Sequence, residues 1–264
     1  MPVQVWVGAA IAAAAGSVAA LAHRAMLRAA GRRSHPLATA SLAVGTALLA
    51  VGLAPVWGRG FTGHVAAHLL LGMLGPLLVV VADPLGAVLG ALEPPLRRRA
   101  LRWLRHPFVA TVSRPTVAWV LAMLSPWLLW LTPAYRVTER VGVLHGLVHL
   151  HFIASGILFA SVVLGVGPLG RRVPPAGGML ALVITLPTHA LLGLVVLSMR
   201  EPTLGVASGG LDALADQRRG AVLMWLAGDL IATAMLAAAF PRWLAWERRR
   251  ARREDEWLRT RSTT

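Results

Sequence analysis

Residues 63–82 read GHVAAHLLLGMLGPLLVVVA, a run of 20 positions without an acidic or Arg side chain. A helix needs about 20 mostly apolar residues to cross the hydrocarbon core of a bilayer. The unusual features of this stretch are two His four residues apart and one Pro. It predicts a membrane-spanning helix that carries polar side chains at a depth where they are costly.

Further segments of the chain share this apolar character and extend the prediction to a seven-helix bundle. They lie near residues 3–21, 37–56, 116–131, 143–166, 179–197 and 221–240. The composition agrees, because 56% of the 264 residues are hydrophobic and only 14% are charged, against about a quarter charged in soluble proteins. We therefore expect an all-α polytopic integral membrane protein, with residues 1–245 as its transmembrane domain, and not a two-domain cytosolic enzyme.

The 26 basic residues are all Arg, and their distribution predicts the orientation of the chain. Twenty of them fall in the segments 24–33, 97–114, 171–172 and 242–261, which lie on one side of the membrane if the spans alternate. Six fall on the other side, at Arg59, Arg136, Arg140, Arg200, Arg218 and Arg219. Because Arg-rich loops remain cytoplasmic, we expect the N-terminus outside and the C-terminus in the cytoplasm.

Two segments are expected to be polar or interfacial. Residues 95–105 alternate Leu and Trp with Arg at helical spacing, as in a helix that lies on the inner membrane surface. Residues 246–264 mix Arg with acidic residues and are expected to form a cytoplasmic tail. The net charge of +15 is thus divided among loops instead of covering one soluble face, so we expect contact with the lipid bilayer and not with nucleic acid.

Polar side chains inside the predicted spans are few, and most are His. They are His64, His68, His145, His149, His151, His189 and Asp229. At 1.5 Å per helical residue, all of them fall in the outer half of the membrane. We therefore expect four helices to contribute to one polar site that faces outward.

The spacing of the His residues favours a metal site. His64 and His68, like His145 and His149, are four residues apart, so each pair lies on one stripe of its helix. Four neutral imidazoles suit copper or zinc, and the absence of Cys excludes thiolate ligands and covalent haem attachment. His151 faces away from His149 and is expected to be structural.

The same residues have plainer interpretations. His189 and Asp229 can be a helix-packing hydrogen bond, or Asp229 can orient a ligand His as its partner. Met73, Met199 and Met224 are possible soft ligands, although Met in an apolar helix usually serves packing. Residues 199–220 are expected to form the longest outer loop, with Glu201, Asp212, Asp216 and Gln217 in it. Trp57, Trp127 and Trp130 are expected in an aromatic belt at the outer interface.

Four motifs resemble those of the CtaG family, the polytopic cytochrome c oxidase assembly proteins of the Bacillus type. They are His64-Val-Ala-Ala-His68 with Met73 and Pro76; His145-Gly-Leu-Val-His149-Leu-His151-Phe152 with Ser155, Gly156 and Phe159; Pro187-Thr-His189 with Gly193; and Asp216-Gln217 with Trp225, Gly228 and Asp229. The resemblance covers about residues 60–240. The sequence departs from the family pattern at Ala160-Ser161, where an aromatic-proline pair is expected, at Gly167, where an acid is expected, and at Asp83, where a small apolar residue is expected.

The resemblance implies a seven-helix protein of the bacterial plasma membrane that matures haem–copper oxidases and handles copper. His64, His68, His145, His149 and His189 become the candidate metal ligands, with His151 and Asp229 as their partners. Oxidase subunits and other copper chaperones are the implied partners in respiratory-chain biogenesis. No pairing of base and nucleophile is visible, so we do not expect an enzyme. The alternatives are a haem b electron-transfer protein, a copper or small-solute transporter with Asp229 and His189 as a proton relay, and a purely structural chaperone.

Overall fold

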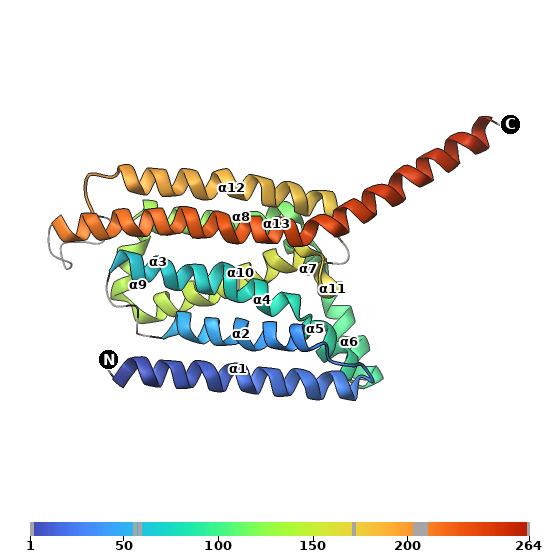
Figure 1. Ribbon diagram of the computed structural model, residues 1–264, viewed down its shortest axis with the longest axis horizontal. Coiled ribbons are helices and arrows are strands. Elements are labelled where there is room, and N and C mark those ends of the chain that lie inside the picture. Colours follow the sequence, from blue (N-terminus) through green and yellow to red (C-terminus); the bar gives the residue numbers. More distant parts are fainter. Residues whose placement is uncertain (1–2, 55–56, 58–59, 171–172, 203–210, 263–264) are drawn as a thin grey trace.

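The computed structural model describes residues 3–54, 57, 60–170, 173–202 and 211–262, and every regular element in these ranges is a helix (Figure 1). The elements are α1 (Val3–Ala29), α2 (Pro36–Leu53), α3 (Phe61–Leu69), the π-helix η2 (Leu70–Leu74), α4 (Gly75–Val81), α5 (Pro84–Ala91), α6 (Pro94–Leu104), α7 (Pro107–Val112), α8 (Pro115–Leu131), α9 (Ala134–Arg140), α10 (Gly142–Leu164), α11 (Gly167–Gly170), α12 (Pro175–Ser198) and α13 (Leu211–Ser262).

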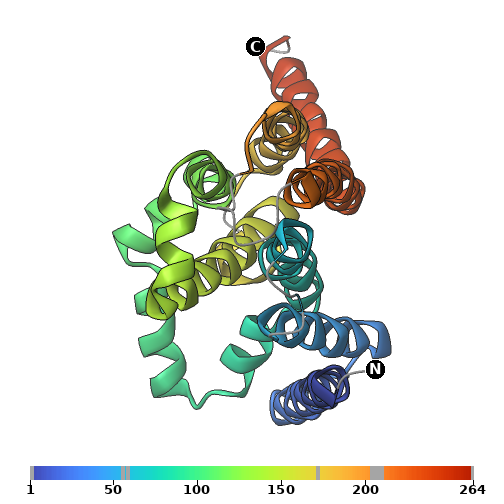
Figure 2. The ribbon, with the colours of Figure 1, turned by 90° about the vertical axis from the view of Figure 1, so that its left-hand side faces the viewer.

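Six helices are long and apolar enough to cross a membrane: α1, α2, the continuous α3–η2–α4, α10, α12 and α13. The apolar helix α8 has 17 residues and lies among them (Figure 2). Large apolar side chains such as Trp6, Val18, Leu180 and Leu230 point outward from these helices. Such a surface is suited to hydrocarbon, and the expected all-α, multipass class is confirmed.

Proline residues explain where many of the helices begin. A Pro stands at the start of α2, α5, α6, α7, α8 and α12. The first turn of a helix has no acceptor for its N–H groups, and the φ angle of Pro is already helical, so Pro is favoured there. Asp83 caps α5 by accepting a hydrogen bond from the Gly86 N–H at 3.0 Å.

Inside the third span, Pro76 has the opposite effect. Proline lacks the N–H that would bond to the carbonyl four residues earlier, and its ring crowds that carbonyl. The helix responds with the π turn of η2, in which the Gly75 N–H donates to the Leu70 carbonyl, five residues earlier. The helical path thus continues from Phe61 to Val81, but with a local widening in its middle.

The predicted edges were wrong mainly at α13. This helix has 52 residues, a length of roughly 78 Å at 1.5 Å per residue. It begins at Leu211, so Asp212, Asp216 and Gln217 are helical and not in a loop. At its other end the expected tail is a helix that continues past Pro241 and projects beyond the bundle (Figure 1).

The described Arg-rich segments lie at one end of the bundle. The α1–α2 connection, α5 to α7 and the outgoing part of α13 are all at the right of Figure 1, whereas the chain begins at the left. The helix expected at residues 95–105 is α6, and none of its residues is buried. Arg59, Arg171 and Arg172 lie outside the described residues. The end at which the chain begins is called the N-terminal end below.

Helix α10 is the centre of the arrangement, in contact with η2, α4, α8, α12 and α13, whereas α1 lies at the edge against α2 and α5 (Figure 2). The close approach of α10 to η2 depends on Gly156. A Cβ at this position would lie 2.2 Å from the Gly72 carbonyl oxygen. The missing side chain lets the helix that carries His145 and His149 pack directly against the one that carries His64 and His68.

Candidate metal centre

Four His side chains from two helices meet near the N-terminal end of the bundle. His64 and His68 are one turn apart on α3 with ring centroids 4.5 Å apart, and His145 and His149 are one turn apart on α10 with centroids 4.4 Å apart. Across the helices, the His64 and His145 centroids are 5.1 Å apart and those of His68 and His149 are 5.3 Å apart. The structure therefore brings the two predicted pairs into a single group.

Within this group, one ring nitrogen each of His64, His145 and His149 lie within 4.8 Å of one another. A zinc ion with three His ligands at 2.0–2.1 Å needs nitrogens about 3.5 Å apart. Small ring rotations close that gap, since all three side chains are only partly buried. These three residues are called the three-histidine cluster below.

His68 occupies a deeper position than the three-histidine cluster. Its side chain is buried, and neither ring nitrogen has a hydrogen-bond partner. One face of its ring stacks on Phe152 at 4.4 Å and 28°. The His64 and His149 rings both meet the His68 ring edge-on, and the His149 Nε2 is also buried without a hydrogen bond. Buried polar atoms normally have partners, so these nitrogens are exceptions among the described residues.

Two aromatic residues that the sequence did not assign to the site support it. The Tyr135 hydroxyl on α9 lies 3.1 Å from His64 Nδ1, and this hydrogen bond orients the His64 ring. Trp130 has its ring 5.7 Å from His64 and 5.6 Å from His68. Trp130 is buried, so its expected place in an interfacial belt was wrong. Tyr135 is the single Tyr of the chain, in a segment that no span pattern covers.

His151 does not join the group. Its Nε2 lies 3.0 Å from both the Leu121 carbonyl oxygen and the Ser125 hydroxyl on α8. The expectation that His151 faces away from His149 accounts for this, because side chains two positions apart on a helix point to nearly opposite faces. His151 thus links α10 to α8.

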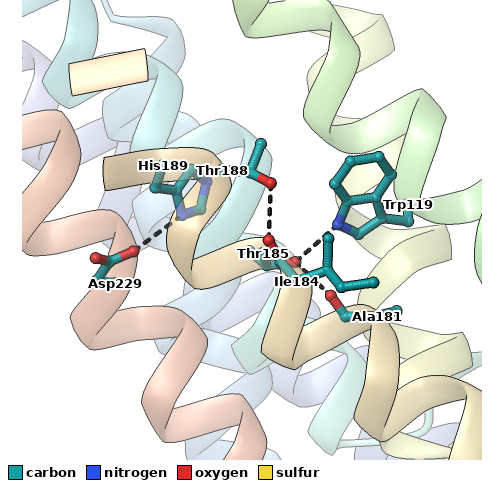
Figure 3. A network of polar contacts seen from close by, with 7 residues as sticks. All are labelled: Trp119, Ala181, Ile184, Thr185, Thr188, His189 and Asp229. Carbon is teal, nitrogen blue, oxygen red and sulfur yellow. Dashed lines mark hydrogen bonds and ion pairs between the residues drawn. The ribbon is translucent and has the colours of Figure 1, made fainter. Parts of the chain in front are cut away.

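His189 and Asp229 form a separate pair between α12 and α13, shown in Figure 3. The His189 Nδ1 and the Asp229 Oδ1 are 3.6 Å apart. Gly228 makes room for the ring, since a Cβ there would lie 3.0 Å from His189 Nδ1. His189 is buried and is not part of the three-histidine cluster, but it lines the same internal cavity as His68.

Polar residues at the start of α13 hold the helices that frame the site. The Asp216 carboxylate accepts from the Thr62 N–H at 3.3 Å, and the Asp216 carbonyl accepts from the Thr62 hydroxyl at 2.8 Å. Gln217 is buried and donates to the Val196 carbonyl at 3.4 Å. These residues therefore join α13 to α3 and α12, and the contact on α3 lies two residues before His64.

The model of the cytochrome c oxidase caa3 assembly factor family (Caa3_CtaG) matches residues 20–245, which is most of the chain. The chain belongs to this family. The CtaG resemblance noted from the His motifs is thereby confirmed, and the matched region contains every candidate ligand.

Other relatives of this CtaG-family chain are uncharacterized proteins of mycobacteria. Those of Mycobacterium bovis and Mycobacterium tuberculosis are each 32% identical over 209 residues, and that of Mycobacterium leprae is 30% identical over 208 residues. In each case the match covers 74% of this chain and 32% of the relative. The chain thus spans about a third of the length of these relatives. No solved structure matches it.

Two departures from the CtaG pattern are neighbours in space. Gly167 stands where an acid is expected and has a φ of +68°, while Asp83 stands where a small residue is expected. A Cβ at Gly167 would lie 3.1 Å from the Asp83 Oδ1. One carboxylate is therefore present at this contact, carried by the N-cap of α5 and not by the first residue of α11. Ala160, the third departure, is completely buried in the core.

Proposed function

We propose that this chain is a multipass membrane assembly factor that binds copper at the three-histidine cluster and passes it to a haem–copper oxidase. The single observation that carries the proposal is the convergence of His64, His145 and His149 nitrogens within 4.8 Å. Membership of an oxidase assembly family supplies the recipient class. The contacts of His68 and Tyr135 with His64 also support the proposal.

The chemistry of the cluster suits delivery. Neutral imidazoles bind copper without bringing negative charge into the membrane. The chain has no Cys, so no thiolate ligand binds the ion. The copper ion can therefore be transferred to an acceptor protein. All three residues of the cluster are only partly buried, which gives a partner protein access to the ion. Oxidase subunits and a soluble copper chaperone are the partners that this role requires.

We place the cluster on the outer face of a bacterial plasma membrane, with α8 as the seventh span. Its 17 residues reach about 25 Å, the lower limit for crossing the hydrocarbon core. Seven spans put the N-terminus and the C-terminus on opposite sides. The described Arg-rich segments gather at the end opposite the cluster, and the positive-inside rule assigns that end to the cytoplasm.

The packing around the cluster favours a bare ion over haem b. The His rings touch one another edge-on at 4.4 to 5.3 Å between centroids. A porphyrin would have to separate them, and the cavity beneath them has a volume of about 40 Å³, against the roughly 300–1,000 Å³ of usual ligand pockets. A single metal ion needs no such rearrangement.

Copper binding by purified protein tests the proposal. We expect Cu(II) added to the wild type in detergent to give an electron paramagnetic resonance spectrum with nitrogen hyperfine structure. The double variant His145→Ala/His149→Ala should lose this bound signal, because two of the three ligand nitrogens are gone. His35→Ala, an exposed residue at the start of α2, is the control and should bind as the wild type does. Equal spectra for the double variant and the wild type would overturn the proposal.

Delivery to the oxidase needs a separate measurement in cells. We expect a strain carrying His145→Ala/His149→Ala to accumulate oxidase with less copper per haem than a strain carrying His35→Ala. Copper uptake into proteoliposomes by the wild type, together with fully metallated oxidase in the variant strain, would instead identify a transporter.

A further inference from the structure

An internal cavity lies beneath the three-histidine cluster, and three Met side chains line it. They are Met73 from η2, Met123 from α8 and Met224 from α13. All three are buried. Of the 8 Met in the chain, three thus converge from three different elements on a space of about 40 Å³, which exceeds the roughly 10–15 Å³ that a single small occupant such as water requires.

Two imidazoles complete the lining of this Met cavity. His68 is 6% exposed, and neither of its nitrogens has a hydrogen-bond partner. His189 enters from the opposite side on α12, and its Nδ1 meets only the Asp229 carboxylate, at 3.6 Å. A buried nitrogen without a hydrogen-bond partner is destabilising. The His68 ring, in which neither nitrogen is hydrogen-bonded, therefore indicates a site that is completed by a ligand.

One helix that borders the cavity is irregular there, and another carries a proline. Met73 lies in the π turn of η2, and Pro126 lies inside α8 on another wall. Single π turns inside α-helices occur frequently at functional sites, because they change the direction of the side chains that they carry. Here the irregular turn carries a thioether into a cavity that a regular helix would pack more tightly.

We propose that the Met cavity is a second metal site, distinct from the three-histidine cluster, and that it takes a soft monovalent ion, Cu(I). Thioether and imidazole ligands select Cu(I) over harder ions. The charge of the site agrees, because the Asp229 carboxylate beside His189 balances one positive charge, whereas a second unit of charge would remain uncompensated in a low-dielectric interior.

His68 connects the two sites. Its ring lines the Met cavity and also lies 4.5 Å from His64 and 5.3 Å from His149 between centroids. A Cu(I) ion can thus pass from the three-histidine cluster to the cavity by exchanging ligands at one side chain, without a change of oxidation state. The Met cavity is called the inner site below, and the three-histidine cluster is the outer site.

Silver(I) is a redox-inert probe for the inner site. We expect wild-type protein in detergent to bind one Ag(I) more, by metal analysis after gel filtration, than the triple variant Met73→Leu/Met123→Leu/Met224→Leu. Leu conserves volume and removes only the sulfur. Met235→Leu is the matched control, since Met235 is equally buried but does not line the cavity; it should bind as the wild type does.

X-ray absorption gives a second readout that needs no variant. Cu(I)-loaded wild type should show sulfur scattering beside nitrogen scattering, and its absence would overturn the proposal even if the triple variant fails to fold. Equal silver binding by the folded triple variant and the wild type would also overturn it.

The proposals for the two sites can be overturned independently of each other. His145→Ala/His149→Ala should lose Cu(II) but keep the inner Ag(I); loss of that silver would show that no separate inner site exists. If silver binds at Met in a protein that shows no Cu(II) signal, the proposal of a metal site at the three-histidine cluster is wrong, and the proposal of a metal site in the Met cavity is supported.

Discussion

At the residue scale, the site depends on side chains that orient the His rings as much as on the rings themselves. Tyr135 is buried at 1% exposure, and its hydroxyl is 3.1 Å from His64 Nδ1. A hydrogen bond at one ring nitrogen determines which nitrogen is presented to a metal. Under the proposed function, the His64 Nε2 is therefore the nitrogen that would bind the metal.

Tyr135→Phe removes this hydroxyl while keeping the shape of the buried ring. We expect copper affinity to fall by about 10- to 100-fold, the usual effect of losing a group that orients a metal ligand. The loss of one hydrogen bond should cost about 1 kcal/mol of stability. Competition against a copper chelator measures the first effect, and thermal unfolding measures the second. Unchanged copper affinity in a folded variant would show that His64 needs no orienting partner.

His151→Ala is the complementary change on the same helix as the cluster. It breaks the contacts of His151 with Ser125 and the Leu121 carbonyl, so we expect a lower melting temperature. Copper binding should stay the same, because the ring lies outside the three-histidine cluster. A loss of copper with unchanged stability would place His151 among the ligands.

At the element scale, the spacing of α10 and η2 decides whether the two His pairs meet. Gly156 allows this approach, since a Cβ there would lie 2.2 Å from the Gly72 carbonyl oxygen and 2.9 Å from Pro76. Backbone cannot move aside as the end of a flexible side chain can. The pairs on α3 and α10 are therefore brought together by a small residue three turns away from the outermost His.

Gly156→Ala should separate α10 from η2 and thereby weaken copper binding and the fold together. We expect a loss of about 1–3 kcal/mol, as for other overpacked cores. Gly146→Ala on the same helix is the matched control, because nothing lies within 4 Å of its Cβ position; it should be neutral or more stable by about 0.5–1 kcal/mol. Thermal unfolding and copper titration of both variants test this prediction. Equal melting temperatures and equal copper affinities would show that the α10–η2 contact does not position the site.

At the scale of the whole molecule, most of the described Arg residues and the candidate His ligands lie at opposite ends of the bundle. The Arg-bearing ends of α1, α6 and α13 lie away from the N-terminal end, where α3 and α10 begin (Figure 1). In a membrane, this polarity favours one orientation of the bundle. Under the proposed function, the orientation determines which compartment supplies the copper.

The absence of Cys makes this orientation directly measurable. Gly142→Cys, at the exposed start of α10, should react with a membrane-impermeant maleimide in intact cells. Arg252→Cys, in the projecting part of α13, should react only after lysis. The reverse labelling pattern would place the three-histidine cluster in the cytoplasm and exclude delivery on the outer face.

The projecting part of α13 should also be dispensable for the bundle. Its described residues after Trp246 are exposed, so they contribute nothing to the core. We expect a chain that ends after residue 247 to keep the melting temperature and copper binding of the full chain. A lower melting temperature would show that the domain boundary expected near residue 245 is wrong.

The sequence by itself determined the helical class, the approximate spans and the pairing of His along α3 and α10. These follow from local rules: apolar runs of bilayer length, Pro at helix starts and the four-residue repeat of a helix face. The same rules separated His151 from His149. They could not find Tyr135 or Met123, whose roles depend on which helices become neighbours.

Only the tertiary structure decided which polar residues share a site. It joined His64 to His145 and His149, placed His189 across the Met cavity beside Asp229, and moved Trp130 from an expected interface to the wall of the site. The physical reason is that helix contacts depend on small residues and interruptions, such as Gly156 and the π turn before Pro76. Their effect is exerted on a neighbouring helix and is therefore invisible in the periodicity of either one.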